Sequence, residues 1–143
     1  MESKYLFVYG SLLSGFKNPA YEYIARYFEF VGPATAPGTL YDLGDYPAAT
    51  PDDATHQIVG ELYKIRNEHQ LSFAIAQLDD YEGVNPEQGE TPNYKRALSN
   101  ISYDHNDVSA WVYWFNHNIS DKPIVASGDV LEYLKAKTEN NQY

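Results

Sequence analysis

Glu82 is the residue whose type and position best suit acid–base chemistry. It follows a segment in which apolar residues recur at helical spacing, namely Leu71, Ile75 and Leu78. At about 100° per residue, Glu82 projects within roughly 60° of these positions, so the apolar stripe ends in a carboxylate. Burial, the negative end of the helix dipole, and the nearby Asp79 and Asp80 would all raise its pKa. Such a group predicts a general acid/base; the competing interpretation is a frayed last turn with Glu82 in water.

The segment from Tyr9 to Leu12 is a second candidate. An apolar run over residues 4–9 predicts a buried strand that stops at Gly10. Glycine lets the backbone approach a ligand closely, and successive free N–H groups after a strand can hold an anion such as a carboxylate. The alternative is an ordinary strand-ending turn, which is the common use of a Gly-Ser pair.

Glu61 lies in the alternating segment 57–66, which predicts a strand with this acid in an otherwise apolar row. It could be a second site carboxylate, or an edge residue paired with a cation such as Lys95 or Arg96. Tyr94 and Arg96 are two residues apart on a predicted strand and therefore share a face. They could bind a carboxylate or hold an acid in place. The chain's 14 tyrosines can each bury a ring and offer a hydroxyl at a pocket wall.

Strands and helices are mixed along the chain, as judged by periods of two and of three to four residues. We expect strands at residues 4–9, 57–66, 93–103 and 108–116, and helices at 21–28, at 67–81 and after Ser127. Strands before, between and after the helices predict an α+β fold with mostly antiparallel neighbours.

Two stretches interrupt this pattern. Glycines and prolines between residues 30 and 46 predict strand pieces that are short or bulged, and residues 46–54 are expected to form a turn-rich loop. Asn67 is the expected N-cap of the second helix, Gly83 its left-handed stop, and Ser127 the cap of the last helix.

Composition limits the classes of protein and partner. The length of 143 residues fits a single domain, 1–143, and 43% hydrophobic with 21% charged residues is typical of a globular chain. Ten basic and twenty acidic side chains give a formal charge of −10. This charge repels phosphate backbones and anionic lipid, so we expect neither a nucleic acid nor a membrane partner. No stretch is apolar enough for a signal peptide or spanning helix, which favours a cytoplasmic location.

Several kinds of site are missing from the sequence. Without cysteine there is no thiolate nucleophile, disulfide or cysteine-based zinc site. The four histidines lack metal-ligand spacing, and neither a glycine-rich phosphate loop nor a GxSxG elbow occurs. An enzyme with this sequence would work by carboxylate acid–base chemistry, with no metal and no cofactor.

Five sequence blocks in order resemble the γ-glutamylcyclotransferase-like superfamily, in particular the small branch with γ-glutamylamine cyclotransferase and the AIG2-like bacterial proteins. The resemblance covers about residues 4–134. The blocks are Leu6-Phe-Val-Tyr9-Gly-Ser-Leu12, Gly38-Thr-Leu-Tyr41-Asp-Leu-Gly-Asp-Tyr-Pro47, Val59-Gly-Glu-Leu-Tyr63, Leu78-Asp-Asp-Tyr-Glu82-Gly83 and Tyr94-Lys-Arg96.

The resemblance implies a small barrel-like mixed sheet with flanking helices around one cavity. It also implies that the loop from Tyr9 to Leu12 binds the substrate's carboxylate and amino end, and that Glu82 is the general acid/base. The α-amino group of a γ-glutamyl substrate then attacks its own side-chain amide, giving 5-oxoproline and a free amine. The substrate-binding residues that we expect are Tyr9, Gly10, Ser11, Leu12, Tyr41, Tyr94, Arg96 and Tyr113.

The substrate class and two alternatives follow. Some family members carry Tyr-Gly-Ser-Asn-Leu, whereas this chain passes directly from Ser11 to Leu12, so the branches acting on glutathione and free γ-glutamyl amino acids fit less well. The first alternative is a non-catalytic binder of small amino-carboxylate ligands in the same cavity. The second is a hydrolase with Glu61 and Glu82 as a carboxylate pair, as in glycosidases. The oligomeric state is left open.

Overall fold

The computed structural model describes residues 3–9, 19–44, 47–51, 56–84 and 91–140. Its strands join in the order β3-β2-β4-β1-β6-β5, and β5 pairs again with β2. This last pairing, Thr35 opposite Ser102, closes five of the strands into a barrel and leaves β3 outside on β2. The strands are β1 (Tyr5–Val8), β2 (Phe28–Asp42), β3 (Pro47–Pro51), β4 (Gln57–Ile65), β5 (Tyr94–Tyr103) and β6 (Asn106–Phe115).

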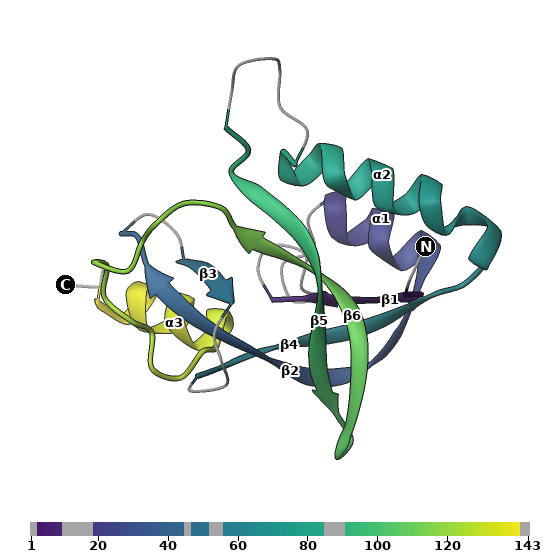
Figure 1. The fold of residues 1–143 in the computed structure, drawn as a ribbon. Helices are drawn as coiled ribbons and strands as arrows, with labels where there is room; N and C mark the ends of the chain where they lie inside the picture. The colour runs from purple at the N-terminus through teal and green to yellow at the C-terminus, as the bar shows by residue number, and fades with distance from the viewer. Residues whose placement is uncertain (1–2, 10–18, 45–46, 52–55, 85–90, 141–143) are drawn as a thin grey trace.

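The predicted fold class is confirmed: the sheet is mixed and mostly antiparallel, with helices on its outside. β1 and β6 run parallel, and the other pairs are antiparallel. Helices α1 (Pro19–Tyr27) and α2 (Leu71–Glu82) lie side by side against one part of the barrel, whereas α3 (Val130–Asn140) lies near β3 (Figure 1). The rings of Tyr27 and Phe73, 5.9 Å apart, join α1 to α2.

The helix that carries Glu82 ends as predicted, whereas the predicted N-cap, Asn67, caps the 3₁₀ turn that precedes it and not α2 itself, which begins at Leu71. Asn67 accepts a hydrogen bond from the backbone N–H of His69 and starts a short 3₁₀ turn, η2 (Glu68–Gln70), which leads into α2. Gly83 ends α2 at φ 73°, a left-handed conformation that glycine adopts without a Cβ clash. The chain therefore turns away directly after Glu82.

Three local predictions were wrong. The predicted bulge is present, between Phe30 and Gly32, but residues 28–42 form one strand of 15 residues rather than separate pieces. Pairing with β4 along most of its length outweighs the weak strand propensity of its glycines and prolines. The expected loop at 46–54 contains β3, a short strand on the open edge of β2. The last helix begins after Asp129, whose carboxylate accepts from the N–H groups of Leu131 and Glu132, and not after Ser127.

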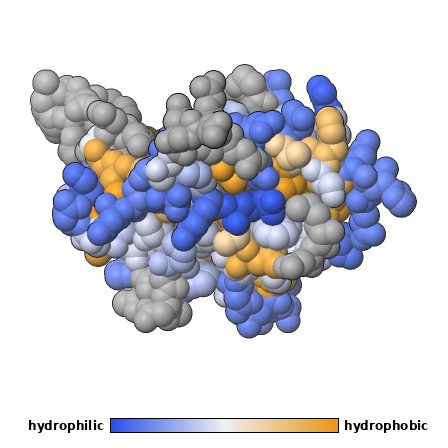
Figure 2. Space-filling view, turned by 45° about the horizontal axis from the view of Figure 1, so that its top comes forward, coloured by the Kyte–Doolittle hydropathy of each residue, from blue (hydrophilic) through white to orange (hydrophobic). Residues whose placement is uncertain are grey.

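On the face seen in Figure 2, hydrophilic side chains cover much of the described surface. The face seen in Figure 2 shows hydrophobic side chains as separate patches between hydrophilic ones. Within the described ranges, no helix has both the length and the apolar character needed to cross a membrane.

Gly60 on β4 allows the end of β1, just before Tyr9, to pack closely against β4. A Cβ at this position would overlap the carbonyl oxygen of Val8 and come within 2.5 Å of the Phe7 ring. Because the first of these obstacles is backbone, rotamer changes alone cannot relieve the overlap.

We therefore expect Gly60→Ala to lower the free energy of unfolding by about 1–3 kcal/mol, because β1 must move away from β4. Val59→Ala is the matched control: it changes the neighbouring, exposed residue and should cost less than about 1 kcal/mol. Urea denaturation measures both. Equal stability of Gly60→Ala and the wild type would contradict this view of the β1–β4 contact.

Candidate active site

Glu82 lies at the point where α2 ends against the barrel. Leu71, Ile75 and Leu78 on the same helix are buried, so the projected apolar stripe is present and ends in this carboxylate. The Glu82 side chain is itself only partly exposed. Burial raises the pKa of Glu82 from 4.5 to about 7. A carboxyl group with this pKa can both accept and donate a proton near neutral pH.

The prediction that Asp79 and Asp80 raise the pKa of Glu82 needs correction. Asp79 is 7% exposed, and its carboxylate accepts hydrogen bonds from Arg96 Nε at 2.8 Å and Arg96 Nη2 at 3.3 Å. The guanidinium therefore compensates its charge. Asp80 is exposed to water, which screens its charge. Desolvation is the cause of the raised pKa of Glu82.

Two tyrosines from different strands lie within electrostatic reach of Glu82. Tyr9 directly follows β1 and donates its hydroxyl proton to the carbonyl oxygen of Tyr113 on β6, at 2.6 Å. Burial, then Tyr94 and Glu82, raise the pKa of Tyr9 well above 10. Burial also raises the pKa of Tyr113, with further contributions from its hydrogen bond to Asp79 and from the charges of Asp79 and Glu82. Both phenols are therefore neutral hydrogen-bonding groups at physiological pH.

The structure assigns Arg96 a partner that the sequence did not indicate. Its guanidinium pairs with Asp79 and lies over the ring of Trp111, 4.4 Å from the ring centroid. It thus holds an acid in place, as one of the predictions had it, but that acid is Asp79. Glu61 accepts a hydrogen bond from the hydroxyl of Tyr63 at 3.1 Å.

Tyr41 and Tyr94 share a small apolar cluster apart from the main core. Both pack against its buried residues Ala48, Phe115 and Ile119. The ring of Tyr94 meets that of Phe115 edge-on, with 5.4 Å between centroids. The electrostatic coupling of Tyr94 to Tyr9 connects this cluster with the surroundings of Glu82.

The site therefore joins Glu82 with Tyr9, Tyr94, Tyr113 and, through Asp79, Arg96. The predicted binding residues Gly10, Ser11 and Leu12 lie outside the described residues. Sequence reasoning missed Asp79 as a member of the site. Its position three residues before Glu82 places it on the same helix face, and that spacing was the available signal.

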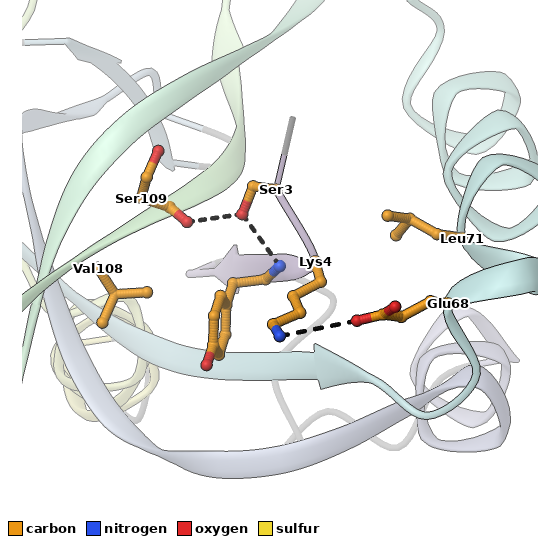
Figure 3. A pocket seen from close by; sticks show the side chains of 7 residues that line it. Ser3, Lys4, Glu68, Leu71, Val108 and Ser109 are labelled. Atoms are coloured by element: carbon orange, nitrogen blue, oxygen red, sulfur yellow. Dashed lines mark hydrogen bonds and ion pairs between the residues drawn. The ribbon is translucent and has the colours of Figure 1, made fainter. Parts of the chain in front are cut away.

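A hollow elsewhere in the molecule is distinct from this site. It has a volume of about 530 Å³ and is lined by residues near the chain start, η2 and β6 (Figure 3). Lys4 and Glu68 form an ion pair of 3.6 Å at its wall. The hollow reaches α2 at Leu71, the first residue of that helix, whereas Glu82 is the last residue of the helix. At 1.5 Å per residue these two positions are roughly 16 Å apart along the helix.

No group of three or more histidine or acidic side chains within the described ranges is arranged to hold a metal ion. The chemistry that this arrangement supports is proton transfer by Glu82 beside neutral phenols.

The raised pKa of Glu82 predicts a pH-dependent stability difference. In the unfolded chain Glu82 ionises near pH 4.5, and in the folded protein near pH 7. Burial therefore costs nothing well below pH 4.5; its cost grows between about pH 4.5 and 7 and stays constant above pH 7. Glu82→Gln, which cannot ionise, should exceed the wild-type unfolding free energy by less than about 1 kcal/mol near pH 5 and by about 3 kcal/mol at pH 8.

Urea denaturation at both pH values measures this difference. Asp80→Asn, which changes an exposed acid on the same turn, is the control and should show no comparable pH dependence. A difference between Glu82→Gln and the wild type that is the same at pH 5 and pH 8 would show that Glu82 is not desolvated.

Comparison with known proteins gives this site a family context. The family model described as Gamma-glutamyl cyclotransferase, AIG2-like, matches residues 6–132. A Halalkalibacterium halodurans protein, provisionally named a gamma-glutamylcyclotransferase, is 31% identical over 105 residues, which are 70% of this chain and 84% of that protein.

Solved structures share the fold. YkqA from Bacillus subtilis has a TM-score of 0.69 and 24% identity; the match covers 96% of this chain, which spans only 43% of YkqA. PH0828 from Pyrococcus horikoshii has a TM-score of 0.67 and 17% identity, with 99% and 100% of the two chains covered. A mouse AIG2-like protein has a TM-score of 0.61 and 22% identity, with 88% of each chain covered. The extent of the family match and the Halalkalibacterium relative together show that the chain belongs to the AIG2-like gamma-glutamyl cyclotransferase family.

Proposed function

We propose that this protein is a cyclotransferase that converts a small γ-glutamyl amide, most simply a γ-glutamyl amine, into 5-oxoproline and a free amine. Glu82 is its general acid/base. The observation that carries the proposal is a desolvated carboxyl group with a pKa of about 7, within electrostatic reach of Tyr9, the residue that follows β1. Membership in the AIG2-like family supports the reaction class.

The reaction needs proton transfer and little else from the protein. The ionised Glu82 takes a proton from the substrate's α-ammonium group, and the resulting amine attacks the γ-carbonyl carbon to form the ring C–N bond. Glu82 then gives its proton to the leaving nitrogen as the amide C–N bond breaks. It takes the second proton from the ring nitrogen as the lactam carbonyl forms and passes it to the released amine, which restores ionised Glu82. Over the whole reaction the α-nitrogen loses two protons and the leaving nitrogen gains two, so no external acid or base is consumed.

Holding the substrate in a folded conformation supplies the rest of the rate. The attacking and attacked groups belong to one molecule, so a site that brings them into contact removes most of the entropic barrier. In this proposal the backbone of Gly10, Ser11 and Leu12 holds the α-carboxylate. Tyr9, Tyr41 and Tyr94 form the remaining wall, because the structure groups Tyr94 with both of the others.

Arg96 and Tyr113 have a supporting role in this scheme. The Arg96 guanidinium is engaged by Asp79 through two nitrogens, and the Tyr113 hydroxyl donates its proton to the same carboxylate. We propose that both act on the site through Asp79 and not by direct contact with substrate. The remaining expectations, a cytoplasmic location and a reaction without metal or cofactor, belong to the proposal as well.

We expect Glu82→Gln to lower kcat/KM for 5-oxoproline formation by about 10²–10⁴, since the amide can neither accept nor donate the transferred proton. Mass spectrometry on a panel of γ-glutamyl amines and γ-glutamyl amino acids measures the product. Glu61→Gln is the matched control, because Glu61 is a partly buried carboxylate on β4 that hydrogen bonds to Tyr63. Its activity should stay within a few-fold of the wild type.

The pH profile gives an independent check. The free enzyme needs ionised Glu82, so kcat/KM should rise with pH through about 7, and Glu82→Gln should lack this rise. Full activity in Glu82→Gln would refute the assigned role. Loss of activity in both Glu61→Gln and Glu82→Gln would favour a carboxylate pair. Ligand binding without ring-closed product from any compound would favour a non-catalytic binder.

A further inference from the structure

The last turn of α2 is tied to the barrel through one side chain. Asp79 lies three residues before Glu82, and its carboxylate is surrounded by donors from two other elements. The hydroxyl of Tyr113 on β6 donates to Oδ1 at 2.7 Å, and Nε of Arg96 on β5 donates to the same oxygen at 2.8 Å. Arg96 Nη2 donates to Oδ2 at 3.3 Å. The two donors stand directly opposite each other across the β5–β6 ladder.

The main chain of Asp79 is hydrogen bonded to the residues that follow Glu82. Its carbonyl oxygen accepts the N–H of Val84 at 3.0 Å, two residues beyond Glu82. The N–H of Gly83 is bonded to the carbonyls of Asp79 and Asp80. Asp79 therefore makes two sets of interactions around Glu82. Its side chain bonds to the barrel at Arg96 and Tyr113, and its carbonyl oxygen bonds to the turn that follows Glu82.

We propose that Asp79 is a positioning residue for Glu82: its ion pair with Arg96 and its hydrogen bond from Tyr113 hold the last turn of α2 against β5 and β6, and thereby fix where the Glu82 carboxyl group lies. This inference rests on the proposed function for its catalytic meaning. The geometry on which it stands is independent of any substrate.

The same pair determines which charges Glu82 experiences. As long as Arg96 and Asp79 are both present, their charges compensate each other beside Glu82. Removing Asp79 leaves an unpaired cation, which favours ionised Glu82; removing Arg96 leaves an unpaired anion, which disfavours it. The described titratable or charged groups around Glu82 are Tyr9 after β1, Tyr94 and Arg96 on β5, Tyr113 on β6, and Asp79 and Asp80 on α2.

The test is a direct titration of Glu82 in the full chain by ¹³C NMR of labelled glutamate carboxyl groups. Glu82→Gln identifies the signal. The titration midpoint should fall by about half a pH unit or more in Asp79→Asn and rise in Arg96→Gln. It should return close to the wild-type value in the double variant. Asp80→Asn, the matched control on the same turn, should leave the midpoint nearly unchanged.

Kinetics separate positioning from folding. Asp79→Asn should lower kcat about tenfold or more with KM within threefold, because the misplaced group is the one that transfers protons. Tyr113→Phe keeps the ion pair and removes one of the two ties, so it should fold and lose a smaller factor of kcat. The double variant, Asp79→Asn with Arg96→Gln, provides a folded comparison if Asp79→Asn alone does not fold.

The outcomes are distinct. An unmoved midpoint in Asp79→Asn, or shifts of the same sign in Asp79→Asn and Arg96→Gln, would overturn the inference, as would a kcat for Asp79→Asn equal to that of the wild type. The titration requires no turnover. If the wild type forms no 5-oxoproline, the proposed reaction fails while opposite midpoint shifts still support Asp79 as the residue that positions Glu82.

Discussion

The removal of the Glu82 carboxyl group from water is the constraint on which the rest of the site depends. A carboxylate in this position is unfavourable at the negative end of a helix and among buried side chains, and the helix tolerates it because a stripe of three buried residues anchors α2 to the barrel. The same desolvation that makes the charged form costly brings its pKa to about 7. The ionised Glu82 therefore lowers the stability of the fold at the position where we propose proton transfer.

Two carboxylates three residues apart on one helix have opposite environments. Asp79 is almost fully buried, yet it has a guanidinium and a phenol as donors, which stabilise the charged form. Glu82 has the neutral phenols of Tyr9 and Tyr113 within electrostatic reach instead. The carboxylate with charge-assisted partners suits a structural role, and the desolvated carboxyl group suits a reactive one.

The sequence predicted the parts of this arrangement that depend on local chemistry. Spacing placed Glu82 at the end of an apolar stripe, Gly83 marked the end of its helix, and Asn67 marked the 3₁₀ turn that leads into it. The long strand β2 was missed because its stability comes from pairing with β4, which no local pattern reveals. β3 was missed for a different reason: it has five residues and carries prolines at both ends, Pro47 and Pro51, which weaken the strand pattern.

The ion pair between Asp79 and Arg96 could not be predicted from local sequence patterns either. Asp79 and Arg96 are 17 residues apart, and their contact depends on how β5 crosses the end of α2. The sequence made Glu61 a possible partner of Arg96 and indicated Asp79 only as a charge near Glu82. Only the closed barrel, with β1 parallel to β6 and β6 beside β5, selects Asp79.

That selection has a chemical consequence for the proposed reaction. A free guanidinium at Glu82 would pair with it and lower its pKa, and the carboxylate would then be too weak a base at neutral pH. Because Asp79 engages Arg96, the uncompensated groups that the described residues place within electrostatic reach of Glu82 include phenols, which hydrogen bond without adding charge. In the proposed scheme a substrate carboxylate is then held by neutral donors such as backbone N–H groups. In this scheme Arg96 lies close enough to hold α2 in place. Its pairing with Asp79 keeps it from pairing with Glu82 and lowering the pKa of that carboxyl group.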